Sequence, residues 1–193
     1  GSMEGMFEGC EKLQSINVSS FSTSNVTNMS RMFYGCKKLR RMDMSANGFD
    51  LSNVTTMSHM FTNCFELGVD LGSTEQAVNF GDQNIAKIVD MSSMFSGCGK
   101  LPRLDLSSFN TANATKMPNL FAGCGELVTI YVSNGWTVSG LTASGSDTDM
   151  FVGCNKLVGG AGTPWAVENP TNKTYAHIDG GTGNPGYLTA KNG

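Results

Sequence analysis

The six cysteines are the residues whose type and spacing could do chemistry. Thiolates and imidazoles bind zinc and paired thiols form disulfides, so a metal site and a disulfide framework both have to be weighed. The cysteines stand alone at intervals of 26–34 residues, no Cys-x-x-Cys occurs, and His59 and His177 lie outside the cysteine phase. The spacing favours free thiols acting as small core hydrophobes, ahead of a disulfide and well ahead of zinc.

Each cysteine closes a five-residue motif, Met-Phe-x-Gly-Cys, with a leucine three residues further on; Asn63 replaces Gly in the third copy and Leu120 replaces Met in the fifth. The motif occupies Met6–Cys10, Met32–Cys36, Met60–Cys64, Met94–Cys98, Leu120–Cys124 and Met150–Cys154. A position filled in the same way in every repeat meets the same neighbours in every repeat, and stacking provides that environment. The Met, Phe, Cys and Leu positions are therefore predicted to form columns inside a stack of about six coils.

The segment after each motif has the alternating pattern of a short strand with one buried face. The pattern is present in Leu39–Met44, Leu101–Leu106 and Leu127–Val132. In the third coil it is assigned to Val69–Leu71, followed by an insertion around residues 73–85. One strand per coil, all running the same way, predicts a parallel sheet along one face of the stack.

The segment that leads into each motif has a different period. Val26, Met29, Met32 and Phe33 are spaced like one face of a short helix, and Gly35 stands where a helix commonly ends. The predicted fold is thus a repeat solenoid of leucine-rich-repeat type, α/β or mainly β, with a parallel sheet on one face and short helices or turns on the other. It is expected over residues 3–158, after a scar of tag cleavage at residues 1–2 and before a C-terminal cap, or the start of a following module, at residues 159–193.

The repeat resembles that of the BspA-like leucine-rich-repeat surface proteins of bacteria. The resembling units are Met-Phe-x-Gly-Cys-x-x-Leu, a strand ending as in Leu104–Phe109, and Asn-Val-Thr-x-Met as in Asn25–Met29. The resemblance implies a secreted or surface-anchored protein from a family associated with adhesion to host proteins or other cells. It implies no catalytic residues and does not name a ligand.

Composition narrows the class of partner. The net charge is −3 and only 15% of the residues are charged, which gives no electrostatic drive toward nucleic acid or an anionic membrane. The basic run Lys37–Arg41 has no counterpart in other coils, so a solvated edge is favoured over a phosphate-binding track. No apolar run is long enough to span a membrane.

The outward strand positions are the candidate binding face. Across the coils, this strip comprises Arg41, Asp43, Asp70, Arg103, Asp105, Thr129 and Tyr131. These side chains either solvate the sheet and limit its association, or form a polar recognition strip; a cation between Asp43 and Asp70 is a minor variant of the second reading. Tyr131 is the best anchor, because aromatic contacts dominate interfaces.

The sequence therefore predicts an extracellular or bacterial cell-surface module that binds a protein, such as a host matrix or other cell-surface protein, through its sheet face. A glycan is the second choice of ligand, and a passive spacer or a non-catalytic accessory domain is the alternative function. Neither histidine belongs to a nucleophile signature and no phosphate-binding glycine motif is present, so no catalytic residue, metal or cofactor is expected.

Overall fold

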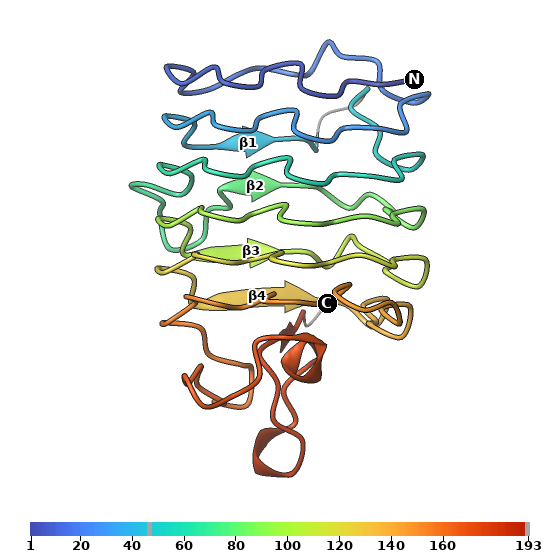
Figure 1. Ribbon diagram of the computed structural model, residues 1–193. Coiled ribbons are helices and arrows are strands. Elements are labelled where there is room, and N and C mark those ends of the chain that lie inside the picture. Colours follow the sequence, from blue (N-terminus) through green and yellow to red (C-terminus); the bar gives the residue numbers. More distant parts are fainter. Residues whose placement is uncertain (46–47, 192–193) are drawn as a thin grey trace.

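The computed structural model describes residues 1–45 and 48–191, in which the regular elements are short strands and 3-10 helices. The strands are β1 (Met42–Asp43), β2 (Val78–Asn79), β3 (Arg103–Asp105), β4 (Thr129–Val132) and β5 (Thr189–Ala190); the 3-10 helices are η1 (Lys173–Tyr175) and η2 (Gly181–Gly183). β1 pairs with β2, and β3, β4 and β5 form a second sheet in that order, with every pairing parallel. Successive windings of the chain, here termed coils, lie on one another, with β1 to β4 in one row (Figure 1).

A second row of parallel contacts joins the coils just ahead of each motif. Isolated bridges pair Asn28 with Thr56, Thr56 with Asp90, and Asp90 with Lys116. Each bridge joins equivalent positions of neighbouring coils, so the coils are in register on this side. The segments from these bridges to the cysteines, residues 28–36, 56–64, 90–98 and 116–124, are termed the turn side below.

Of the short helices or turns predicted for the segment leading into each motif, the structure has turns; the helix inferred from the spacing of Val26, Met29, Met32 and Phe33 is not formed. Backbone N–H groups alternate between two acceptors, as when Cys36 donates within its coil to the carbonyl of Phe33 at 3.1 Å and Phe33 donates to Met60 of the next coil at 2.9 Å. Arg31 and Gly35 have φ values of 58° and 69°, which interrupt any right-handed helix. The apolar side chains still point inward because successive turns repeat a spacing close to that of a helix.

The phenylalanines of the motif form the predicted column through the core. From Phe7 to Phe151 the rings stack with centroid separations of 5.4–6.1 Å and are nearly parallel. Phe33, Phe61, Phe95, Phe121 and Phe151 are fully buried. Burying one such side chain contributes roughly 1.5–3 kcal/mol, so the shared column ties each coil to the next.

The six cysteines are free thiols, and all except Cys10 are buried. Each buried thiol donates to the carbonyl of the motif phenylalanine in the preceding coil, as Cys98 does to Phe61 at 3.2 Å. Burial raises the pKa of Cys36 to about 11 and that of Cys154 to about 12. The thiols therefore stay protonated at neutral pH and serve as core residues with one weak hydrogen bond each.

The strand of the third coil lies at a different place in the sequence from the one predicted. This strand is β2, at Val78–Asn79, and not Val69–Leu71; β2 pairs Val78 with Met42 and Asn79 with Asp43. Both segments alternate in hydrophobicity, but Val78 and Phe80 are buried, whereas Val69 and Leu71 are only partly so. The extra residues therefore lie before the strand, at residues 68–76, here termed the insertion loop, and not at residues 73–85.

The C-terminal segment packs on the last coil. β5 continues the second sheet next to β4, and the buried ring of Tyr187 meets Phe151 edge-on at 5.2 Å. The buried carboxylate of Asp179 accepts hydrogen bonds from the backbone of Ala161, Thr163, Gly181 and Gly186, and from the hydroxyl of Thr163. These contacts fold residues 159–191 against the stack; residues 192–193 of the predicted C-terminal segment lie outside the described residues.

Candidate functional site

The strand pairings show which of the predicted face residues lie together. Arg103 lies opposite Thr129, and Asp105 lies opposite Tyr131, which in turn lies opposite Thr189 of β5. Asp43 lies opposite Asn79. Asp70 is not in this row: it sits in the insertion loop with its side chain 86% exposed, and Asn79 takes the place assigned to it.

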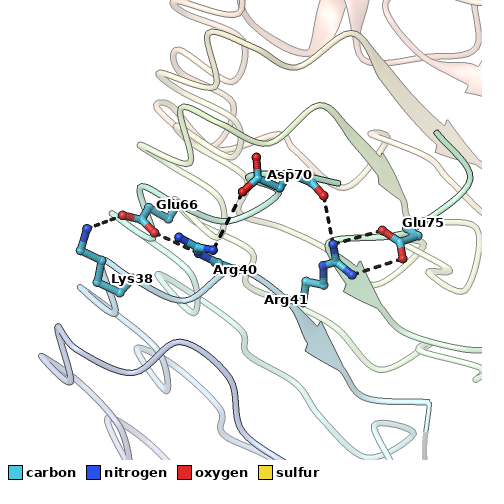
Figure 2. Close-up of polar contacts among 6 residues, drawn as sticks. All are labelled: Lys38, Arg40, Arg41, Glu66, Asp70 and Glu75. Atoms are coloured by element: carbon cyan, nitrogen blue, oxygen red, sulfur yellow. Dashed lines mark hydrogen bonds and ion pairs between the residues drawn. The ribbon is translucent and has the colours of Figure 1, made fainter. Parts of the chain in front are cut away.

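Arg41 and Arg103 hold the insertion loop onto the sheet face. Arg41 forms an ion pair with Glu75, with an N–O distance of 3.1 Å, and donates to the carbonyl of Asp70, also at 3.1 Å (Figure 2). Arg103 donates to the carbonyl of Glu75 at 2.6 Å and also to that of Gly72. The hydrogen bonds and the ion pair of both arginines are therefore made to the insertion loop of the same chain.

The rest of the basic run is neutralised in the same way. Lys38 and Arg40 share the carboxylate of Glu66, and Arg40 also approaches Asp70 at 3.9 Å (Figure 2). Lys37 pairs with a carboxylate of the first coil, Glu11, at 2.7 Å. The hydrogen bond from Lys38 lowers the pKa of Glu66 below its ordinary value, and Arg40 makes a smaller contribution in the same direction. The run is thus a set of cross-coil ion pairs, in keeping with the solvated edge expected from the sequence.

One row of polar residues on this face has a structural role that the sequence reasoning missed. Side-chain oxygens of Asn17, Asp43, Asn79 and Asp105 accept from the backbone N–H two residues later, at distances of 2.9–3.0 Å. Each residue closes an Asx turn at the end of its strand segment. The signal was present as the recurrent spacing Asx-x-Ser or Asx-x-Gly. The cation considered between Asp43 and Asp70 is excluded as placed, because these two residues do not share a row.

The C-terminal segment adds a cation to the face. Lys191 pairs with the carboxylate of Asp105, and its ammonium lies 5.4 Å from the ring centroid of Tyr131. Burial acts to raise the pKa of Asp105, but the hydrogen bonds from Lys191 and Ser107 outweigh it and leave the pKa lowered. Tyr131 remains partly exposed beside this pair. Lys191 lies 86 residues from Asp105 in the chain, so no local pattern could have revealed the contact.

Among the hollows formed by the described residues, three are lined by residues of this face. The first, of about 410 Å³, is lined by Arg41, Met42, Asp43, Thr74, Glu75, Gln76 and Asn79. The second, of about 310 Å³, lies beside Arg40, Arg41 and Asp70. The third, of about 130 Å³, extends from Gln76 and Asn79 to Asp105 and Lys191. Residues of the insertion loop line all three hollows. The hollows of this face therefore form where the third coil carries residues that the other coils lack.

Two other features are absent from the described residues, a cluster of metal ligands and a membrane-spanning helix. No group of three or more histidine, cysteine or acidic side chains in residues 1–45 and 48–191 is placed to hold a metal ion. In the same part of the chain, no helix has the length and apolar character needed to cross a bilayer.

A family model described as "Mycoplasma protein of unknown function, DUF285" matches residues 1–79 and 73–180. The two matches together span most of the chain, which therefore belongs to this family. No curated protein and no solved structure matches the chain. The family description assigns no activity, so the face described above has to supply the functional argument.

Proposed function

We propose that this chain is a leucine-rich-repeat solenoid of the BspA-like kind and acts outside the cell or on a bacterial cell surface as a protein-binding module. The in-register coils, the parallel strands and the motif columns support the fold assignment. Membership of the DUF285 family and the repeat's resemblance to bacterial surface proteins support the location.

The observation that carries the binding assignment is where the irregular parts of the molecule gather. The insertion loop and the C-terminal Lys191 come from distant parts of the chain, and both lie on the sheet face. Hollows next to them are lined by charged and amide side chains. Loops held on a rigid scaffold are where recognition residues are commonly found, so this face is the best candidate for contact with a partner.

The proposal includes the absence of catalysis. Thr62 is the side-chain hydrogen-bond partner of His59, and burial lowers the pKa of His59. His177 bonds through Nδ1 to the carbonyl of Ile178. In the described part of the chain neither imidazole is hydrogen-bonded to a cysteine, so neither is arranged to activate a thiolate nucleophile.

The experiment is a binding screen of the purified protein against extracellular-matrix proteins and a glycan array. A protein hit that weakens at least about thirtyfold in Tyr131→Ala would support the proposal, since truncating an anchoring aromatic typically costs about 2 kcal/mol or more at interfaces. Tyr34→Ala is the matched control, because Tyr34 stacks with Arg31 on the turn side and should leave binding unchanged. Equal losses in both variants would contradict the assignment to the sheet face.

A passive spacer is the second candidate, and one observation favours it. The donors of Arg41 and Arg103 are already engaged by the insertion loop, which leaves fewer strong groups for a partner. If the folded protein bound neither any extracellular-matrix protein nor any glycan on the array, that result would support the spacer function.

A further inference from the structure

Two of the hollows on the sheet face adjoin each other, because Gln76 and Asn79 line both. The larger lies between the insertion loop and Arg41 and Asp43; the smaller leads to Asp82, Asp105 and Lys191. The two together are termed the Gln76 groove. The larger hollow alone, at about 410 Å³, is within the size range of ligand sites.

The carboxylates of the groove outnumber its cations. Arg41 is neutralised by Glu75, and Lys191 by Asp105. Two carboxylates, Asp43 and Asp82, form no ion pair within the described residues. Among its lining residues the groove therefore has an excess of negative charge; the guanidinium of Arg103, which contacts the carbonyls of Gly72 and Glu75, is not one of them.

The spare atoms of the groove are mainly acceptors. Asp43 uses Oδ1 for its contacts with Ser45 and Asn79, and its second oxygen has no partner in the part of the chain that the structure describes. The Oε1 atom of Gln76 is buried, again without a described partner. The acceptors that a ligand can reach are therefore the second oxygen of Asp43 and the carboxylate of the exposed Asp82, both of which suit a ligand that brings donors.

We propose that the Gln76 groove binds a cationic side chain, arginine or lysine, presented by a segment of the partner protein. The inference rests on the proposed function and names the chemistry of the partner. A guanidinium offers five donors and no acceptor, and an ammonium offers three donors, which complements both the spare acceptors and the charge. A polyanion is repelled by the same groups.

The test uses the intact ¹⁵N-labelled protein and short capped peptides. Acetyl-Gly-Arg-Gly-amide and its lysine analogue should shift the backbone amide signals of residues 76–82, and the shifts should weaken as salt is added. The double variant Asp43→Asn, Asp82→Asn should lower the apparent affinity about tenfold, in line with the loss of charge-assisted hydrogen bonds. Glu168→Gln, which removes one exposed charge from the C-terminal segment, is the control and should bind as the parent does.

The glutamate peptide acetyl-Gly-Glu-Gly-amide and methyl glucoside complete the series. No shift with the arginine and lysine peptides, an equal shift with the glutamate peptide, or a response to the glucoside alone would overturn the inference. A partner from the screen that binds the double variant as tightly as the parent would also overturn it, while the proposed function stands. If the arginine and lysine peptides bound but the screen returned no protein partner, the inference that the groove binds cationic side chains would stand, and the result would count against the proposed function.

Discussion

The turn side and the sheet face of this molecule are built on different principles. On the turn side, the motif phenylalanine donates its backbone N–H to the next coil at 2.9–3.0 Å from Phe33 through Phe121, and Phe7 of the first coil does the same. On the sheet face, the strands vary from two to four residues, and the third coil carries an insertion loop. The turn side repeats the same backbone contacts in every coil, whereas the contacts of the sheet face differ from coil to coil.

The difference separates the residues that hold the coils together from those to which we assign the proposed contact with a partner. Repeated ladders give a solenoid its stability through the sum of neighbouring contacts, so the turn side tolerates little change. The sheet face is attached to that scaffold through the alternate, buried residues of its strands. Apart from the residues that close Asx turns, its outward residues can therefore vary without loss of the fold, as the proposed recognition surface requires.

The largest expected effect is that of breaking the phenylalanine column in its middle. Phe95→Ala should lower the free energy of unfolding by about 3–5 kcal/mol, because the ring is fully buried between Phe61 and Phe121. Denaturant unfolding measures the loss. Phe65→Ala is the matched control: its side chain is 47% exposed, and the expected loss is below about 1 kcal/mol. Similar losses in the two variants would show that the column is not the source of stability.

The next effect concerns the anchor of the C-terminal segment. Hydrogen bonds from Thr163, Gly181 and Gly186 outweigh burial and lower the pKa of Asp179 to about 2. This contribution is complete above the ordinary pKa near 3.8 and is lost as the pH falls through about 2. Asp179→Asn should destabilise the segment by about 2 kcal/mol at neutral pH, since an amide NH₂ replaces one acceptor oxygen.

Acid titration of tryptophan fluorescence measures this effect, because the indole of Trp136 donates to Ala176 and that of Trp165 to Phe151. Asp147→Asn is the control, since its carboxylate accepts only a 3.4 Å contact from Lys173 among the described bonds. An acid transition unchanged in Asp179→Asn would refute the assigned role.

The buried thiols make the core sensitive to alkali. Their pKa is raised by burial, so their contribution is complete below the ordinary value near 9.0 and is lost as the pH rises from there toward about 12, the pKa of Cys154. Each unit of pH in that window should cost up to about 1.4 kcal/mol per thiol. Unfolding midpoints from pH 8 upward, compared between the parent and Cys154→Ala, measure the slope. A thiol reagent should modify only the exposed Cys10 in the native protein.

The smallest effect is expected on the sheet face. Glu75→Gln removes one partner of Arg41 and should cost less than about 1 kcal/mol, because both side chains are nearly half exposed. The amides of the insertion loop should nevertheless exchange hydrogen faster, while those of the turn side stay protected. Glu168→Gln provides the comparison, and a global loss of protection in Glu75→Gln would place the loop among the elements that hold the stack together.

The sequence was sufficient for the parts of the fold that repeat. The strands β1, β3 and β4 lie in the segments where alternation predicted them, and the motif phenylalanines and cysteines form the expected columns. Both results follow because identical residues at one phase of a repeat experience identical surroundings.

Two features were mistaken because the patterns are degenerate. Apolar residues at Val26, Met29, Met32 and Phe33 fit a helix, but consecutive turns with a left-handed Arg31 place them inside as well. Val69–Leu71 alternates like a strand, and only the Asx-x-Gly spacing from Asn79 to Gly81 indicated where the third strand ends. The attachment of the insertion loop by Arg41 and Arg103, and the contact of Lys191 with Asp105, depend on the folded chain and had no sequence signal.

The most direct test of the central claim is hydrogen exchange of the protein with and without the first protein partner that the screen returns. Protection should be gained at residues 41–43, 72–79, 103–105, 129–131 and 189–191, which lie on the sheet face, with no change in the motif segments of the turn side. Protection gained on the turn side, with the sheet face unaltered, would contradict the account.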